Sequence, residues 1–155
     1  MFNISLKDSD LSSRVKSVIG IPDAFLNDSV ITSPDFKYKA EIYINSQLNE
    51  LNEIYEEEEK EVSEEVQRLI DMSAIYYIAY LLCVSMPVRL PNRMENISTK
   101  TLLQTIDWYK FAEEMLGRCD DLLNKILEDE EVDSSTLGNT VIALSDETTY
   151  PNEMM

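Results

Sequence analysis

Hydrophobic residues recur along most of the chain at helical spacing, three or four positions apart. The first such stretch can begin at Asp8 or Asp10, since either can cap a helix, and it ends at Gly20, a residue typical of helix ends. One face of this stretch carries the apolar positions Leu11, Val15, Val18 and Ile19. We therefore predict a first helix here, followed by a loop over residues 21–32.

The clearest helix start in the sequence is Ser33-Pro34-Asp35. Ser33 can cap, Pro34 stands where its missing N–H costs nothing, and Asp35 suits the positive end of the helix dipole. A second helix is predicted from here, with the apolar positions Phe36, Ala40, Tyr43, Ile44, Leu48, Leu51 and Tyr55. The acidic run that follows, residues 56–61, either forms a turn or continues as helix, and the pattern does not decide between them.

A third helix is predicted from Val62 to Ser85. Its first half is amphipathic, whereas Ala74–Val84 is apolar on every side, which is typical of a central helix covered all round. Pro87 is expected to end it. Residues 87–96 contain two prolines and have no period, so we predict a long extended loop.

A fourth helix is predicted to begin at Ser98 or Thr99 and to reach about Glu130. It carries one long apolar stripe, formed by Leu102, Leu103, Ile106, Tyr109, Ala112, Met115, Leu116, Cys119, Leu122, Leu123, Ile126 and Leu127. Gly117 lies within this helix and costs about 1 kcal/mol relative to alanine. The fold class is therefore all-α, with a four-helix domain over residues 1–131.

Residues 132–155 break the helical pattern and are predicted to form an extended C-terminal tail. Residues 134–138 have the composition of a flexible linker. One β-prone stretch follows them, made of Thr140, Val141, Ile142, Ala143 and Leu144. Because a lone strand has to pair with something, we expect it to add to a partner's sheet. The alternative is that its apolar side chains fold back onto the chain's own helices.

Composition removes most enzyme classes. The chain has no histidine, two cysteines and three glycines, which excludes His-ligated zinc, Ser-His-Asp triads, Cys-His dyads and glycine-rich phosphate loops. Cys83 and Cys119 lie on apolar helix faces, where buried thiols are expected. The acidic residues 56–65 lack the order of an EF-hand and are expected to form a solvated face; an electrostatic contact surface is the next alternative and metal binding the last. We predict no catalytic site, no metal and no cofactor; a small enzyme using carboxylates alone is a further alternative.

The net charge of −17, from 30 acidic and 13 basic residues, repels nucleic acid over long range. Residues 1–6 contain neither the basic nor the apolar segment of a signal peptide. The longest apolar run, residues 74–84, falls short of the roughly 20 residues that cross a membrane. We therefore expect a soluble protein, made in a reducing cytoplasm, with no membrane contact.

The stretch after Pro87 is the one basic segment of the chain. Arg89, Arg93 and Lys100 stand there against a single acid, Glu95. They either pair with carboxylates elsewhere in the chain or present a basic loop to an anionic partner.

Four segments resemble the head–tail connector (adaptor) proteins of tailed phages. They are the Leu11–Val15 helix leading into residues 20–22, the tyrosine-containing second helix, the apolar third helix ending in a proline loop, and Ile106–Leu116 of the last helix. The resemblance covers about residues 8–130.

This resemblance implies a non-enzymatic virion protein of the phage neck, made in the host cytoplasm. It implies a homo-oligomeric ring, commonly twelve-fold, that docks beneath the portal protein beside other neck and tail proteins. Genomic DNA would pass through the lumen without sequence-specific binding. Arg89, Arg93 and Lys100 would lie near that lumen or near an anionic neighbour, and the tail strand would dock on the portal rim or on an adjacent subunit.

A different class of function is an acidic intracellular binding protein or inhibitor, a DNA mimic whose carboxylates imitate phosphates. Such a protein would act as a monomer or dimer, so its mass in solution distinguishes it from a ring subunit.

Overall fold

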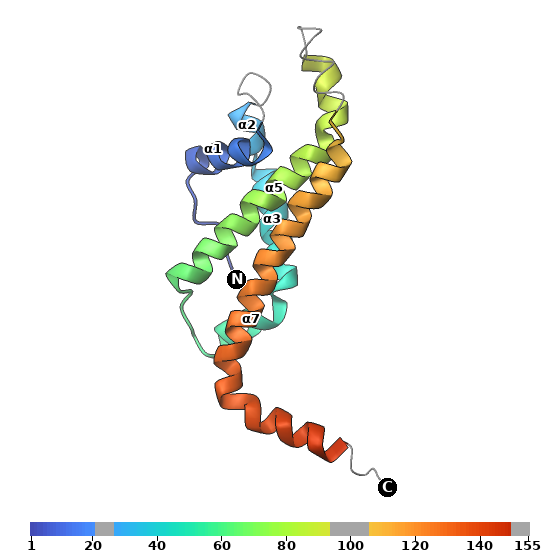
Figure 1. Ribbon diagram of the computed structural model, residues 1–155. Helices are drawn as coiled ribbons and strands as arrows, with labels where there is room; N and C mark the ends of the chain where they lie inside the picture. Colours follow the sequence, from blue (N-terminus) through green and yellow to red (C-terminus); the bar gives the residue numbers. More distant parts are fainter. Residues whose placement is uncertain (21–26, 94–105, 150–155) are drawn as a thin grey trace.

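A computed structural model describes residues 1–20, 27–93 and 106–149, and for residues 88–93 and 131–149 it describes the backbone alone. The described residues form the helices α1 (Asp8–Ile19), α2 (Asp28–Ile31), α3 (Pro34–Gln47), α4 (Asn49–Glu57), α5 (Glu64–Arg93) and α7 (Trp108–Thr149) (Figure 1). The predicted all-α class is confirmed. The predicted count of four helices is wrong, because the second one is divided and α2 lies in the predicted loop.

Helix α5 is the central element, and it packs against α1, α3 and α7 (Figure 1). Its buried side chains are Val66, Leu69, Ile70, Ala74, Ile75, Ile78, Ala79, Leu82, Cys83 and Met86. The prediction that residues 74–84 are covered on every side is wrong at Val84, whose side chain is 41% exposed. A helix with three packing partners still leaves one narrow stripe open.

Helix α1 has the predicted start and end. Gly20 adopts a left-handed conformation with φ of 75°, and its N–H donates to the Lys16 carbonyl at 2.8 Å. Two contacts tie α1 to α2: the Ser12 hydroxyl donates to Asp28 at 2.6 Å, and the Lys16 ammonium lies 2.5 Å from the same carboxylate. The loop residues 21–26 lie outside the described residues.

The second predicted helix begins as expected, since the Ser33 hydroxyl accepts from the Asp35 N–H at 3.3 Å. It is interrupted at Leu48, where φ is −104° and ψ is 25°, so that α3 and α4 are separate helices. Leu48 is itself buried, as are Ile44 before the break and Leu51 after it. The apolar residues keep their helical spacing across the break at Leu48, so the sequence pattern does not reveal the break.

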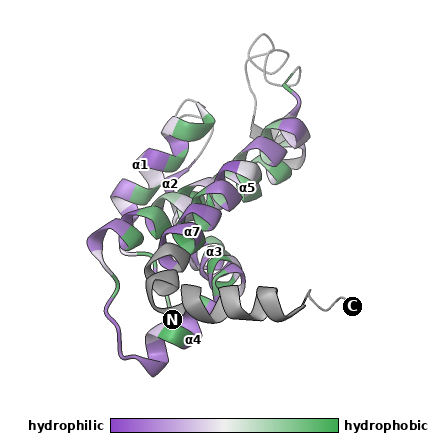
Figure 2. Cartoon of the chain, turned by 60° about the horizontal axis from the view of Figure 1, so that its bottom comes forward, coloured by the Kyte–Doolittle hydropathy of each residue, from purple (hydrophilic) through white to green (hydrophobic). Residues whose placement is uncertain are grey.

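The acidic run does not continue as a helix: its first two residues end α4, and a turn follows them. Helix α4 ends at Glu57, and Glu59 has a positive φ of 52°. The Lys60 N–H donates back to the Tyr55 carbonyl at 2.9 Å and closes the turn. Figure 2 shows this connection to α5 as a hydrophilic stretch of chain.

The predicted helix end at Pro87 is wrong, since α5 continues through Pro87 to Arg93. Residues 87–93 of the predicted extended loop are therefore helical, and its remainder, residues 94–96, lies outside the described residues. The φ of proline is itself helical, so the cost is a lost hydrogen bond and crowding of the preceding turn, about 3 kcal/mol. Burial of Met86 just before the proline holds this part of the helix in the core and opposes that cost.

The predicted start of the fourth helix at Ser98 or Thr99 is also wrong as a continuous helix, because residues 106 and 107 are not helical. Helix α7 begins at Trp108. Asp107 caps it, since its carboxylate accepts from the Lys110 N–H at 3.1 Å and its carbonyl accepts from the Phe111 N–H at 3.0 Å. Aspartate is a strong capping residue. The apolar positions continue at helical spacing on both sides of Asp107, so the sequence pattern did not indicate that a helix begins there.

The extended tail and its strand are wrong in backbone conformation. Helix α7 runs without interruption to Thr149, so Thr140–Leu144 is helical. The described residues contain no strand with which this segment could pair, and a helix satisfies its backbone N–H and C=O groups internally. The predicted division at residue 132 therefore does not coincide with the end of a helix.

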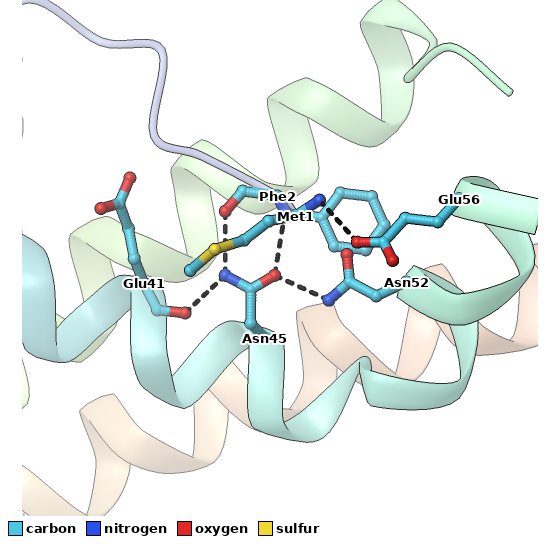
Figure 3. A network of polar contacts seen from close by, with 6 residues as sticks. All are labelled: Met1, Phe2, Glu41, Asn45, Asn52 and Glu56. Atoms are coloured by element: carbon cyan, nitrogen blue, oxygen red, sulfur yellow. Dashed lines mark hydrogen bonds and ion pairs between the residues drawn. The ribbon is translucent and has the colours of Figure 1, made fainter. Parts of the chain in front are cut away.

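An extended arm, residues 1–7, precedes α1 and lies against α3 and α5. Asn45 of α3 holds it, accepting from the Phe2 N–H and donating to the Phe2 carbonyl, both at 2.9 Å (Figure 3). Asn52 of α4 donates to the same Asn45 oxygen at 2.7 Å. The Phe2 ring is buried and meets Tyr55 edge to face. The arm is therefore an integral part of the helical body.

Candidate interaction surface

A groove runs between α1 and the first half of α5. It consists of two pockets, of about 390 Å³ and about 240 Å³, which adjoin because Arg14 lines both. Arg68 of α5 lines the larger pocket, and Val18, Ile75 and Tyr76 are among the residues of the smaller, more apolar one. We call this surface the arginine groove.

Asp71 lies at the bottom of the groove, and its charge is satisfied internally. The buried carboxylate accepts from the Ser5 N–H at 2.8 Å, from the Ser5 hydroxyl at 2.5 Å and from the Gln67 amide at 3.1 Å. These bonds also fix the N-terminal arm along the rim of the groove. Asp71 is therefore occupied and does not need either arginine.

Arg14 and Arg68 are exposed and form no ion pair with any described residue. Lys16 is paired with Asp28, Lys37 with Asp8 and Lys60 with Glu130, whereas the exposed Lys7, Lys39, Lys110, Arg118 and Lys125 also form no ion pair with a described residue. Two guanidinium groups in one groove, flanked by apolar side chains, suit a carboxylate or phosphate with an apolar stem.

Helix α7 carries unpaired acids on the face turned away from α5. Glu114, Asp121 and Glu128 are exposed and follow one another every seven residues, and the exposed Lys110 and Lys125 lie on the same face, so acids and lysines alternate along one stripe. Gly117 lies in the same stripe between Glu114 and Asp121, and a Cβ added there would meet nothing within 4 Å. We call this stripe, residues 114, 117, 121 and 128, the α7 outer face.

The inner side of α7 uses its acids differently. The Tyr43 hydroxyl of α3 donates to Asp120 at 2.5 Å, and the Tyr55 hydroxyl of α4 donates to the buried Glu130. Burial and the neighbouring Asp120 raise the pKa of Tyr43. These tyrosine–carboxylate bonds fasten α3 and α4 to α7, so the acids that remain for a partner are those of the outer face.

The residues singled out from the sequence as a basic site are not brought together among the described residues. Arg89 and Arg93 lie in the last turns of α5, where the backbone alone is described, and Lys100 lies outside the described residues. Their place beside a lumen or an anionic neighbour stays a prediction, as does docking of the C-terminal segment on a partner.

The two thiols are buried in the helical core. Burial raises the pKa of Cys83 to about 12, and burial together with Asp120 raises the pKa of Cys119 to about 12. Neither is a thiolate at neutral pH. Among the described residues, no group of three or more acidic or thiol side chains is arranged to hold a metal ion.

One helix in the described part of the chain, the Glu64–Pro87 portion of α5, is long and apolar enough to cross a membrane by length and composition. In this fold, 61% of its apolar window is buried by the rest of the chain. Counting only uninterrupted apolar residues overlooked this stretch. A central core helix passes the same test, so the finding carries no statement about location.

Sequence reasoning missed both arginines as a site. Asp10 stands four positions before Arg14, and Glu64 stands four positions before Arg68, so local pairing would be expected from the sequence. Only the fold shows that these pairs do not form. The arm, by contrast, had a detectable signal, because Phe2, Ile4 and Leu6 alternate with polar residues in the period of an extended segment.

Comparison of the chain with protein-family models, with curated proteins and with solved structures gave no match.

Proposed function

We propose that this chain is a structural subunit of a tailed-phage head–tail connector, an adaptor that forms a ring beneath the portal. The four segments that resemble this family support the proposal. The observation that carries it furthest is that one chain presents an open groove with two arginines and, on another helix, three exposed acids, none of which forms an ion pair with a described residue. Complementary surfaces at different places on one chain are what a ring of identical subunits requires.

The charge of the chain suits the passage of DNA. A ring built from subunits of charge −17 repels the duplex and keeps it from adhering to the lumen. Arg89, Arg93 and Lys100 would provide a few local contacts along the path or to a neighbouring subunit. DNA would then occupy the lumen only during its passage, and the ring would make no sequence-specific contact with the bases.

The proposal is tested by the mass of the full chain in solution. Native mass spectrometry and sedimentation over a wide concentration range should show a closed oligomer of many copies, and negative-stain images should show rings. Addition of a portal ring should give a complex of fixed stoichiometry. A chain that stays monomeric or dimeric at every concentration, alone and with the portal, contradicts the proposal.

The acidic binding protein is the second candidate, favoured by the α7 outer face. Its three acids recur about every 10.5 Å along the helix, with Lys110 and Lys125 on the same face, and the net charge of −17 adds to the negative field that a DNA-binding protein would meet. In that case the chain would bind such a protein as a monomer or dimer, and double-stranded DNA would displace it. The same mass measurement distinguishes the two candidates.

A further inference from the structure

We propose that the arginine groove receives the α7 outer face of a second copy of this chain, with Arg14 and Arg68 of one copy binding Glu114 and Asp121 of the next. This inference rests on the proposed ring and names its contact between subunits.

Charge is the first reason. Arg14 and Arg68 have no carboxylate partner among the described residues, although the chain carries 30 acidic side chains. Asp71, the buried acid that lines the groove, is already engaged by Ser5 and Gln67. The exposed acids of α7 supply the missing partners, and an Arg–carboxylate pair at an interface can be bidentate.

Gly117 is the second reason. A glycine in a helix interior costs about 1 kcal/mol relative to alanine, and no described residue requires it, since an added Cβ would meet nothing there within 4 Å. On the outer face it removes a side chain from the position between Glu114 and Asp121. A neighbouring helix can therefore approach the backbone of α7 closely there, with one acid on either side.

The position of the two surfaces is the third reason. Helices α1 and α7 both pack on α5, and Figure 1 shows them on different sides of it. Arg118 of α7 lies 5.8 Å from the ring centre of Tyr76 at the edge of the groove, yet Glu114 and Asp121 form no ion pair with Arg14 or Arg68 among the described residues of one chain. Each copy would offer its groove to one neighbour and its outer face to the next, which is the heterologous contact that closes into a ring when the rotation fits.

A second copy fits the groove better than nucleic acid does. Glu64 lines the groove together with Arg68, so a continuous row of phosphates would bring negative charge against this carboxylate. Single carboxylates on a helix can enter between the arginines without bringing a row of charges along.

The test reverses the charge of each surface in a separate variant of the full-length chain. One variant carries Arg14→Glu with Arg68→Glu, and the other carries Glu114→Arg with Asp121→Arg. Each alone places like charges opposite one another and should need about a hundredfold higher concentration to assemble. An equimolar mixture should recover assembly at wild-type concentration, because each reversed surface then meets its complement in the other variant.

Two controls change similar charges elsewhere: Lys39→Glu on α3, and Glu50→Arg with Glu53→Arg on α4. All these side chains are exposed. Both controls should assemble like wild type. Should a reversed variant melt at a lower temperature, the milder pair Arg14→Ala with Arg68→Ala replaces it and should weaken assembly about tenfold.

Each outcome decides between the two proposals. If wild type forms rings and both reversed variants do so equally well, the contact assigned here is wrong and the ring stands. If wild type never assembles, the ring and the contact are both wrong. If assembly is unchanged while the arginine variants lose binding to duplex DNA, the groove belongs to nucleic acid.

Discussion

Helix α5 packs against α7 on one side and borders the arginine groove on another. Charged groups are paired on the first side and unpaired among the described residues on the second. Between α5 and α7 the buried side chains are apolar, and α3 and α4 fasten α7 through the bonds of Tyr43 to Asp120 and of Tyr55 to the buried Glu130, which Lys60 also contacts. Toward α1, two pockets remain open and two guanidinium groups have no ion partner among the described residues.

The two sides of α5 therefore have different roles: one stabilises the fold of a single copy, and the other offers contacts to a partner. A packed side with satisfied polar groups contributes to the free energy of folding of a single copy. An open groove with unpaired charges contributes little to that free energy and offers affinity to a partner. The predictions below test this separation, beginning with the largest expected effect.

Replacing Leu123 by aspartate should unfold the chain. Leu123 is 2% exposed on the inner side of α7, so Leu123→Asp buries an unpaired charge and should cost more than about 4 kcal/mol. Circular dichroism and thermal melting measure it. The matched control, Asn124→Asp, adds the same charge at the exposed neighbouring position and should melt like wild type. Equal melting of the two variants would show that α7 does not pack as described.

Removing one hydroxyl should weaken the bond between α4 and α7. Tyr55→Phe leaves the buried Glu130 without its tyrosine donor and should lower the free energy of unfolding by about 1–3 kcal/mol. Denaturant unfolding measures the change. Tyr109→Phe removes the same atom from a side chain that is 62% exposed and should have almost no effect. A Tyr55→Phe variant as stable as Tyr109→Phe would contradict the assigned bond.

Adding one methyl group on the outer face should stabilise a single copy. Gly117→Ala finds free space for its Cβ and restores helix propensity, so the free energy of unfolding should rise by up to about 1 kcal/mol. Assembly should not improve in parallel, because the methyl group stands where a neighbour approaches. Loss of stability in the monomeric form would mean that Gly117 serves the interior of this chain.

The smallest effect concerns the tie between α1 and α2. The hydrogen bonds from Lys16 and Ser12 hold the pKa of Asp28 below its ordinary value of 3.8. The folded state thus favours the charged form, so this contribution is present above the ordinary pKa and is lost as the pH falls through the lowered value. Asp28→Asn should melt slightly below wild type at neutral pH, and the difference should vanish in acid. A difference that persists unchanged in strong acid contradicts this cause.

Local signals predicted those parts of the fold that depend on neighbours in sequence. The start of α3 at Ser33-Pro34 and the end of α1 at Gly20 are set by caps, and the all-α class follows from apolar spacing. The helix through Pro87 and the helical Thr140–Leu144 could not be read this way. Proline and β-branched residues express preferences of about 1–3 kcal/mol, which the rest of the helix can override.

The candidate surface depends on information that the sequence does not hold locally. Whether Arg14 pairs with Asp10, four positions away, is decided by side-chain directions across α1 and α5. Asp71 is unavailable to the arginines because Ser5, far away in the chain, occupies it. The α7 outer face could have been predicted from its seven-residue repeat of acids, had the helix been divided into inner and outer stripes rather than read for its core alone.

Carbodiimide cross-linking between copies tests the central claim most directly. Arg14→Lys with Arg68→Lys preserves the charge of the groove and supplies amines, and mixing ¹⁴N- and ¹⁵N-labelled chains identifies links between different copies by mass. We expect intermolecular links from positions 14 and 68 to Glu114 and Asp121, and fewer such links from the equally exposed Lys39. Links from the groove that join it only to carboxylates of the same chain, or to other acids of a second copy, would contradict this assignment.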